Sequence, residues 1–360
     1  MANINSYIIS HQKRIGLFNP YNELDALVFA RFSYLPFHRI RLSENETIGG
    51  ACRKLSEILN REDYVWPDDF DFVENLKKSH RFSGLNISNF VRRNSNSLEK
   101  QFSAITIHLN PFKMYISFFG TDNILVGWKE DFNLAFMDHI PSQTEAKKYL
   151  EVVANKYPLK KMYLGGHSKG GNLAMYSSIT APDSLQKRIK KIYNYDGPGL
   201  RKGTMALDLG HEKVLGKIIS IIPQDSIVGR LFEHNEAVKV VKSNAKSLYQ
   251  HDIYSWEIND KKFVESKTTK GSDLVDKTIT NWLETASKDE RKVFINSLFE
   301  ALEKANINGP LDLKSKWPKI MTNALKTFVK LPKENKKTIM EVWKKLGSSF
   351  LNARKGKNAK

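Results

Sequence analysis

The sequence predicts an α/β fold with a mostly parallel central sheet, followed by a C-terminal helical region. Four short apolar runs lie between residues 160 and 243, each ending in turn or polar residues, and a helical stretch separates the first two. Nearly continuous apolar strands that alternate with helices are typical of a parallel sheet covered on both faces. Beyond about residue 275 the apolar residues recur at helical spacing, punctuated by prolines.

The individual elements follow from changes in apolar period. Residues 22–37 place apolar side chains at helical spacing and meet Pro36, which predicts an amphipathic helix. Residues 101–121 contain two β-branched and aromatic runs split at 110–112, the pattern of a hairpin. A second helix is expected over 144–157. Further strands are expected over 160–166, 190–197, 217–225 and 237–243, with a helix over 170–180.

Length and composition favour a folded protein. The chain has 360 residues, of which 41% are hydrophobic and 27% charged, enough for one large domain or two smaller ones. Lys, Thr, Gly and Ser gather at 265–275 and suggest a boundary there. We expect a catalytic-type domain over 1–270, a basic helical region over 271–352 and a disordered tail over 353–360.

The net charge of +18 is concentrated near the C-terminus. Residues 261–360 carry 23 Lys and Arg against 11 Asp and Glu, a surplus of 12. Such a surplus favours anionic partners, among which an anionic membrane surface is preferred here to nucleic acid. A solvated Lys-rich helical face explains it equally well. The oligomeric state is not readable from the sequence.

The single cysteine, Cys52, excludes a disulfide-stapled scaffold and any Cys-rich metal site. Neither a secretory signal nor an apolar run of 18 residues is present in the sequence. We therefore expect a location in the cytoplasm, or export by a route that reads no N-terminal signal.

The clearest chemical signal is the pentapeptide Gly166-His167-Ser168-Lys169-Gly170, at the end of a predicted strand and the start of a predicted helix. A nucleophile elbow needs a serine on a sharp strand-to-helix turn, and glycines two residues away on either side prevent steric clashes. The alternative is a Gly-rich turn or phosphate loop. Residues 210–217 miss the phosphate-loop pattern by one residue.

A serine nucleophile needs a histidine base and a carboxylate to orient it, and this sheet type usually supplies them in the order Ser, acid, His. Asp225 directly follows a predicted strand and is the preferred acid. Asp196, before a Gly-Pro-Gly turn, is the second candidate and is interpreted as a turn residue. His251 is the preferred base, whereas His234 is interpreted as a surface loop residue.

Two main-chain amides are expected to stabilise the oxyanion. The amide of Lys169, first in the predicted helix, is one donor. Thr121, in the segment after an earlier strand, is the second candidate, and a turn or N-cap role is its alternative.

These residues resemble those of the α/β-hydrolase superfamily, in particular class 3 lipases and the related Mbeg1-like family. The resemblance extends from about residue 23 to 257 and includes FFGTDN, GGHSKGGNLA, YNYDGPG, IIPQDSIVG and QHDIYSW. It implies Ser168 as nucleophile, Asp225 as acid, His251 as base, and Thr121 and Lys169 in the oxyanion hole. Class 3 lipases usually carry Arg where this chain has Phe119.

The expected function is that of a serine hydrolase cleaving carboxylic esters, with lipid or phospholipid esters favoured because related families act on lipids. No cofactor or metal is required for this chemistry. Two alternatives stay open: an exported phospholipase-type toxin with a helical delivery region, and a non-catalytic scaffold that binds anionic partners through its basic C-terminus.

Overall fold

The computed structural model describes residues 2–121, 125–204, 211–307 and 333–358, together with 322, 323, 326, 328 and 329. The chain divides into two compact units. The first, called the sheet unit, comprises Met1–Arg93, Phe102–Gly120 and Ser142–Thr268; the second, called the helical unit, comprises Asn94–Gln101, Thr121–Pro141 and Thr269–Lys360. The helical unit therefore takes two segments from the region that the sequence analysis assigned entirely to the domain over 1–270.

The central sheet has seven strands in the spatial order β1 to β7. Strands β2 and β3 are antiparallel, as expected for the hairpin, and β3 through β7 pair in parallel. The predicted mostly parallel sheet is thus confirmed. The strands are β1 (Asn86–Ser95), β2 (Lys100–Asn110), β3 (Lys113–Phe118), β4 (Lys161–His167), β5 (Ile189–Tyr195), β6 (Ile218–Pro223) and β7 (Ala237–Val241).

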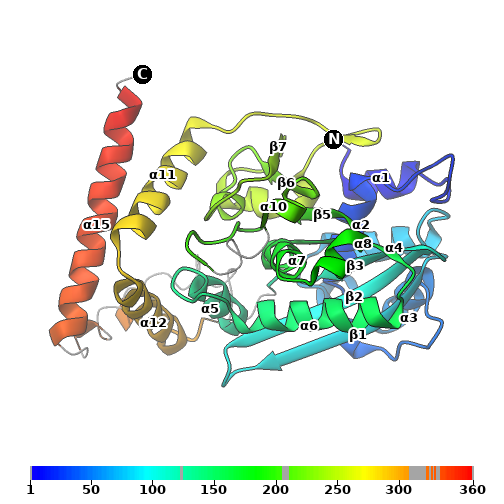
Figure 1. Cartoon of the computed structure of the whole chain (residues 1–360), viewed down its shortest axis with the longest axis horizontal. Coiled ribbons are helices and arrows are strands. Elements are labelled where there is room, and N and C mark those ends of the chain that lie inside the picture. The colour runs from blue at the N-terminus through cyan, green and yellow to red at the C-terminus, as the bar shows by residue number, and fades with distance from the viewer. Residues whose placement is uncertain are drawn as a thin grey trace. The chain divides into compact units, whose positions relative to one another are not determined.

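Helices cover both faces of this sheet, because successive strand residues point to opposite sides. Ile105 and Tyr115 pack with one set of helices, whereas Ala104 and Met114 pack with the other. The first set is α1 (Ile4–Ser10), α2 (Glu23–Phe32), α3 (Ile48–Ile58) and α4 (Asp68–Lys78); the second is α6 (Pro141–Lys156), α7 (Lys169–Ile179), α8 (Asp183–Arg188) and α10 (His211–Leu215). Figure 1 shows α6 and α7 side by side over the second face.

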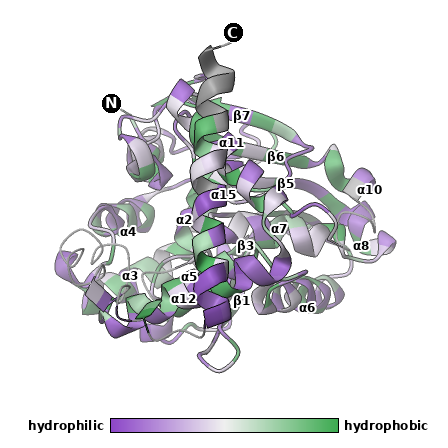
Figure 2. Ribbon diagram, turned by 90° about the vertical axis from the view of Figure 1, so that its left-hand side faces the viewer, coloured by the Kyte–Doolittle hydropathy of each residue, from purple (hydrophilic) through white to green (hydrophobic). Residues whose placement is uncertain are grey.

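The predicted helices α2 and α6 form close to their expected positions. Asn22 caps α2 in a reciprocal box with Asp25, which satisfies main-chain N–H groups at the start of the helix. The helix ends at Phe32, before Pro36. Figure 2 shows hydrophilic and hydrophobic residues alternating along α6, in keeping with a helix that buries one side. Sequence patterns did not indicate α1, α3, α4 or β1.

The helical unit contains α5 (Leu125–Asn133), α11 (Lys270–Thr285), α12 (Lys288–Lys304) and α15 (Lys333–Asn358). Trp282 and Val342 pack together, and Lys345 forms an ion pair with Glu290 at 2.7 Å. Helix α15 extends to Asn358, and residues 359 and 360 lie outside the described part of the chain. The disordered tail over 353–360 stays a prediction. None of the described helices is long and apolar enough to cross a membrane.

Candidate active site

Ser168 lies on the turn between β4 and α7, in a backbone conformation that residues other than glycine rarely adopt. Its φ is 57° and its ψ is −133°, and it is the N-cap residue of α7. Such a conformation costs about 1–3 kcal/mol and persists only where surrounding contacts hold it. The Ser168 amide donates to the Tyr195 carbonyl at 2.9 Å, and its own carbonyl accepts from the Gly171 amide at 2.9 Å. The turn is therefore held from both sides.

The two glycines that flank this turn are required by close backbone approach. A Cβ atom on Gly166 would lie 2.4 Å from the Phe118 carbonyl oxygen, and one on Gly170 would lie 2.2 Å from the same oxygen. Real Cβ atoms essentially never come within 3.0 Å of a non-bonded heavy atom of another part of the chain. Any other residue at either position would push α7 away from β3, which explains the Gly-x-Ser-x-Gly spacing.

The structure brings the imidazole of His251 to the end of β5. His251 ends the short 3-10 helix η4 (Ser247–His251), and its side chain is 27% exposed. Its Nδ1 lies 2.6 Å from Oδ2 of Asp196, the first residue after β5. Since Nδ1 meets the carboxylate, Nε2 is the ring nitrogen left for a substrate or a nucleophile.

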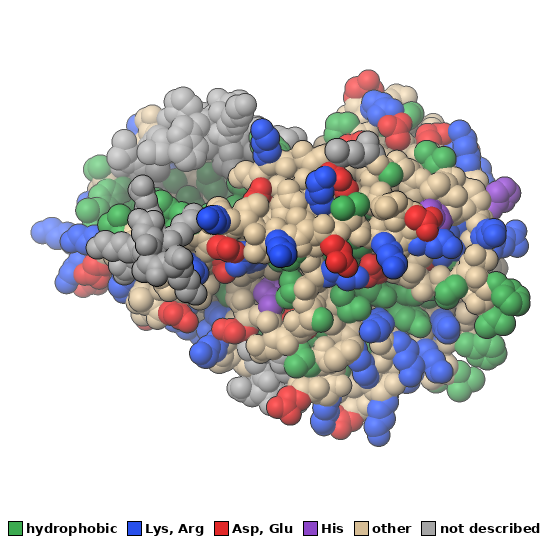
Figure 3. All heavy atoms as spheres, turned by 90° about the horizontal axis from the view of Figure 1, so that it is seen from above, with side chains coloured by type: hydrophobic (Ala, Val, Ile, Leu, Met, Phe, Trp, Pro, Cys, Tyr) green, Lys and Arg blue, Asp and Glu red, His purple; other side chains and the backbone are tan. Residues whose placement is uncertain are grey.

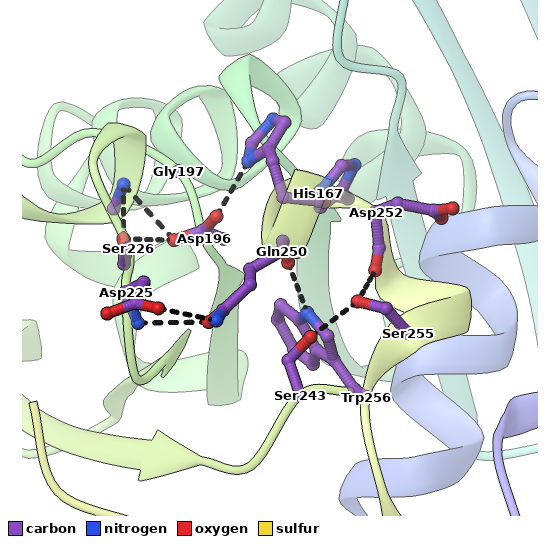
Figure 4. A network of polar contacts seen from close by, with 12 residues as sticks. His167, Asp196, Gly197, Asp225, Ser226, Ser243, Gln250, Asp252, Ser255 and Trp256 are labelled. Atoms are coloured by element: carbon purple, nitrogen blue, oxygen red, sulfur yellow. Dashed lines mark hydrogen bonds and ion pairs between the residues drawn. The ribbon is translucent and has the colours of Figure 1, made fainter. Parts of the chain in front are cut away.

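Asp196 is built into its position by a small hydrogen-bond network. Asp196 is 1% exposed and has a φ of 48°. Its other carboxylate oxygen accepts from the Ser226 hydroxyl at 2.5 Å and from the Gly229 amide at 3.2 Å. Figure 4 shows Ser226 beside the Asp196 carboxylate. A buried carboxylate held by several donors keeps a fixed position from which it can orient an imidazole.

Among the hydrogen bonds that the structure describes, Asp225 is paired with Gln250, whereas the sequence analysis expected it to be paired with His251. Its carboxylate accepts from the Gln250 side-chain amide at 2.8 Å, and its main-chain amide donates to the Gln250 side-chain oxygen at 2.9 Å (Figure 4). The physical reason is the register of η4. Consecutive residues of a 3-10 helix point about 120° apart, so Gln250 meets the end of β6 while His251 meets the end of β5.

The turn after Asp196 contains a signal that sequence analysis interpreted as a structural turn near the site, with Asp196 as the second candidate acid. A Cβ atom on Gly197 would lie 2.2 Å from the Ser168 carbonyl oxygen. Gly197 is therefore glycine because the segment after β5 passes directly against the serine turn. The Gly-Pro-Gly sequence marks proximity to Ser168, and this was the available clue that Asp196 lies at the site.

His167, the residue before Ser168, contacts the histidine turn. Its Nε2 lies 2.8 Å from the His251 carbonyl oxygen, and the two imidazole rings are 4.5 Å apart at their centroids. A carbonyl can only accept, so Nε2 carries the proton. Tyr34, just after α2, places its hydroxyl 3.2 Å from the His167 Nδ1.

The protonation state of His167 follows from its surroundings. Burial and the neighbouring charge of His251, followed by that of Arg31, lower the pKa of His167 well below its ordinary value. A neutral ring with its proton on Nε2 leaves Nδ1 as an acceptor for the Tyr34 hydroxyl. His167 is therefore a neutral bridge between Tyr34 and the main chain of His251.

The two expected oxyanion donors lie at the starts of the segments that follow β3 and β4. Lys169 is the first residue of α7 and is 1% exposed. Thr121 follows Gly120 after β3, and within the helical unit its hydroxyl donates to the Asp131 carboxylate at 2.5 Å. Residues 122–124 lie outside the described part of the chain.

Other candidate residues lie elsewhere. His234 places Nδ1 2.7 Å from the Glu236 carboxylate and is not paired with Asp196 or Asp225 among the contacts that the structure describes. Cys52 is buried in α3, and burial raises the pKa of its thiol above the usual range. Over the described ranges, His, Cys, Asp and Glu side chains form no group of three or more that has the arrangement of a metal site.

The parallel sheet covered by helices on both faces, with a serine at a strand-to-helix turn, defines an α/β-hydrolase fold. Residues 76–300 match the Mbeg1-like family, and the chain belongs to that family. No curated protein matches the sequence.

Solved structures of fungal lipases show limited similarity to this chain, each at 15% identity. The Lip2 lipase of Yarrowia lipolytica aligns over 44% of this chain and 65% of its own, with a TM-score of 0.31. A fungal lipase–inhibitor complex aligns over 47% and 69%, with a TM-score of 0.35. A mutant form of MDLA from Penicillium cyclopium aligns over 68% and 86%, with a TM-score of 0.38. This chain thus spans less than two thirds of the Lip2 chain.

Proposed function

We propose that the protein is a serine hydrolase that cleaves carboxylic esters through an acyl-enzyme on Ser168. His251 is the general base and Asp196 is the carboxylate that orients it. The observation that carries the proposal is the 2.6 Å contact of Asp196 with the Nδ1 of His251, at the edge of the sheet where Ser168 occupies its strained turn. A nucleophile elbow, a histidine and a buried acid are the three parts that this chemistry needs.

The chemical steps assign one task to each group. The Ser168 hydroxyl attacks the ester carbonyl while its proton passes to the Nε2 of His251. The tetrahedral oxyanion then collapses, and the same proton is given to the departing alkoxide, which leaves as an alcohol. Water, deprotonated by His251, then attacks the acyl-enzyme. The second tetrahedral intermediate collapses, the proton on His251 passes to the Ser168 oxygen, and the carboxylic acid is released. Asp196 stabilises the imidazolium in both halves of the reaction.

Oxyanion stabilisation is assigned to two main-chain amides. The amide of Lys169 follows the nucleophile directly, at the positive end of the dipole of α7. The amide of Thr121 is the second donor, from the segment that follows β3. A neutral His167 adds no positive charge beside the candidate base.

The substrate class proposed is a lipid or phospholipid acyl ester. The basis is the resemblance of the FFGTDN, GGHSKGG and QHDIYSW segments to class 3 lipases. The basic surplus beyond residue 261 is compatible with an anionic lipid surface. Figure 3 shows Lys and Arg side chains interspersed with acidic ones on one face of the molecule. Location in the cytoplasm or export without an N-terminal signal stays a prediction.

Covalent labelling tests the proposal directly. A fluorophosphonate probe should label the wild-type protein at Ser168 and should not label Ser168→Ala. Ser177→Ala is the matched control, since Ser177 lies on the same helix and its hydroxyl only donates to the Ala174 carbonyl. Turnover of p-nitrophenyl esters should fall by about 10⁴-fold or more in Ser168→Ala. A folded wild-type protein that is not labelled and does not hydrolyse esters would contradict the proposal and favour a non-catalytic scaffold.

A further inference from the structure

Two large apolar side chains project into solvent from the turn that carries the candidate base. Leu248 is 63% exposed and Tyr249 is 73% exposed, and both lie in η4. Gln250 is buried and His251 occupies the candidate site, so exposure changes abruptly between residues 249 and 250. Adjacent exposed apolar side chains at the margin of a site are typical of a surface that contacts a membrane or an apolar partner.

The exposure of this pair is a consequence of how η4 is anchored. The Gln250 side chain bonds to Asp225 in both directions and donates to the Ala245 carbonyl at 3.0 Å. The indole of Trp256, itself fully buried, donates to the Gln250 carbonyl at 2.8 Å. Because Gln250 is fixed from three sides, the two preceding side chains cannot turn inward without breaking these bonds.

The sequence that leads to the pair is basic. The segment 237–250 contains Lys239, Lys242 and Lys246, and it contains no Asp or Glu. Lys239 and Lys242 form ion pairs with Glu23 and Glu257. Lys246 is exposed and makes no ion pair among the contacts described for this part of the chain, so its charge faces solvent directly beside the apolar pair.

A second exposed apolar pair provides an internal comparison. Leu17 and Phe18 are 89% and 92% exposed, with Lys13 and Arg14 close by in sequence. This loop precedes Tyr21, whose ring packs against Tyr163 near the beginning of β4. The site lies at the other end of that strand. Of these two pairs, the one on η4 is therefore the one beside the candidate base.

We propose that Leu248 and Tyr249, with Lys246, form the contact through which the protein binds the surface of an anionic phospholipid bilayer. The inference rests on the proposed ester hydrolase function and names where its lipid substrate is met. The leucine side chain enters the acyl region, the tyrosine ring sits at the headgroup level, and the lysine faces anionic headgroups. A lipid that leaves the bilayer at this point enters next to His251.

Vesicle sedimentation separates binding from catalysis. The probe is a vesicle of phosphatidylcholine with 30% phosphatidylglycerol, and every variant carries Ser168→Ala so that no lipid is consumed. We expect the double variant Leu248→Ser, Tyr249→Ser to bind at least 10-fold more weakly than its parent. The matched control Leu17→Ser, Phe18→Ser should bind within 2-fold of the parent. Equal binding by the two double variants would overturn the proposal.

Charge and activity give two further readouts. Lys246→Gln should weaken binding by several-fold at low salt and should make little difference at high salt. With Ser168 restored, the η4 variant should hydrolyse a short water-soluble ester at the wild-type rate while losing vesicle hydrolysis. A wild-type protein that binds vesicles through this pair and hydrolyses no ester would contradict the proposed function and leave the docking surface intact.

Discussion

The ends of β5 and β6 are alike in sequence and different in what they contact. Each strand is apolar, each is followed within two residues by an aspartate, and both aspartates meet η4. Asp196 receives the imidazole of His251, whereas Asp225 receives the side-chain amide of Gln250. One residue of register in η4 thus decides which carboxylate is paired with the candidate base.

The two carboxylates also differ in how deeply they are buried and in how they are held. Asp196 is buried, with its second oxygen held by Ser226 and Gly229. Asp225 is only partly buried, and its main-chain amide is part of the contact with Gln250. A carboxylate that must stabilise a transient imidazolium benefits from the low dielectric constant of a buried position. We therefore propose an electrostatic role for Asp196 and a positioning role for Asp225.

The largest expected effect is that of Asp196→Asn. An asparagine keeps the shape of the side chain but cannot hold the imidazole in the required tautomer or stabilise its charged form. We expect kcat for a soluble ester to fall by about 10⁴-fold with a nearly unchanged far-ultraviolet circular dichroism spectrum. Steady-state kinetics with a p-nitrophenyl ester provides the measurement. A fall of less than 10-fold would remove Asp196 from the acid role.

A smaller loss is expected when the anchor of η4 is removed. In Gln250→Leu, Asp225 and the Ala245 carbonyl lose three partly buried hydrogen bonds, a loss that we expect to cost about 1–3 kcal/mol. The free energy of unfolding in urea should fall by that amount. We expect kcat to fall by about 10-fold, because His251 follows Gln250 directly. Unchanged kcat in a destabilised variant would show that the pair stabilises η4 without positioning the base.

Stability at acid pH tests the neutral bridge formed by His167. Its folded-state pKa lies well below that of an unfolded histidine, so the unfolded chain binds the proton first. The contribution of a neutral His167 to the free energy of unfolding is therefore complete above about pH 6.5. It falls as the pH drops below that value, with a slope approaching about 1.4 kcal/mol per pH unit. His167→Asn should lose less stability between pH 7 and 5 than wild type. Urea unfolding at each pH measures the difference, and parallel curves would contradict a buried neutral His167.

Sequence patterns predicted the fold better than the site. The hairpin, β4 to β7, α6 and α7 follow from apolar periodicity, which reports burial within one segment. The Gly-x-Ser-x-Gly spacing likewise reports a local steric requirement at Gly166 and Gly170. Which aspartate meets His251 depends on how η4 docks against two strand ends, and no local pattern records that docking. Gly197 was the exception, because the close approach of this position to Ser168 requires a glycine, which is visible in the sequence.

The smallest expected effect, that of Asp225→Asn, is the counterpart of the largest. An asparagine retains the main-chain amide and a side-chain oxygen, and these are the two groups that contact Gln250. We expect kcat within about 3-fold of wild type and a stability change below about 1 kcal/mol. Both are measured on the same ester and in the same urea series as Asp196→Asn. If the two asparagine variants exchange their effects, Asp225 is the acid, and the contact of His251 with Asp196 describes a resting arrangement that the reaction leaves.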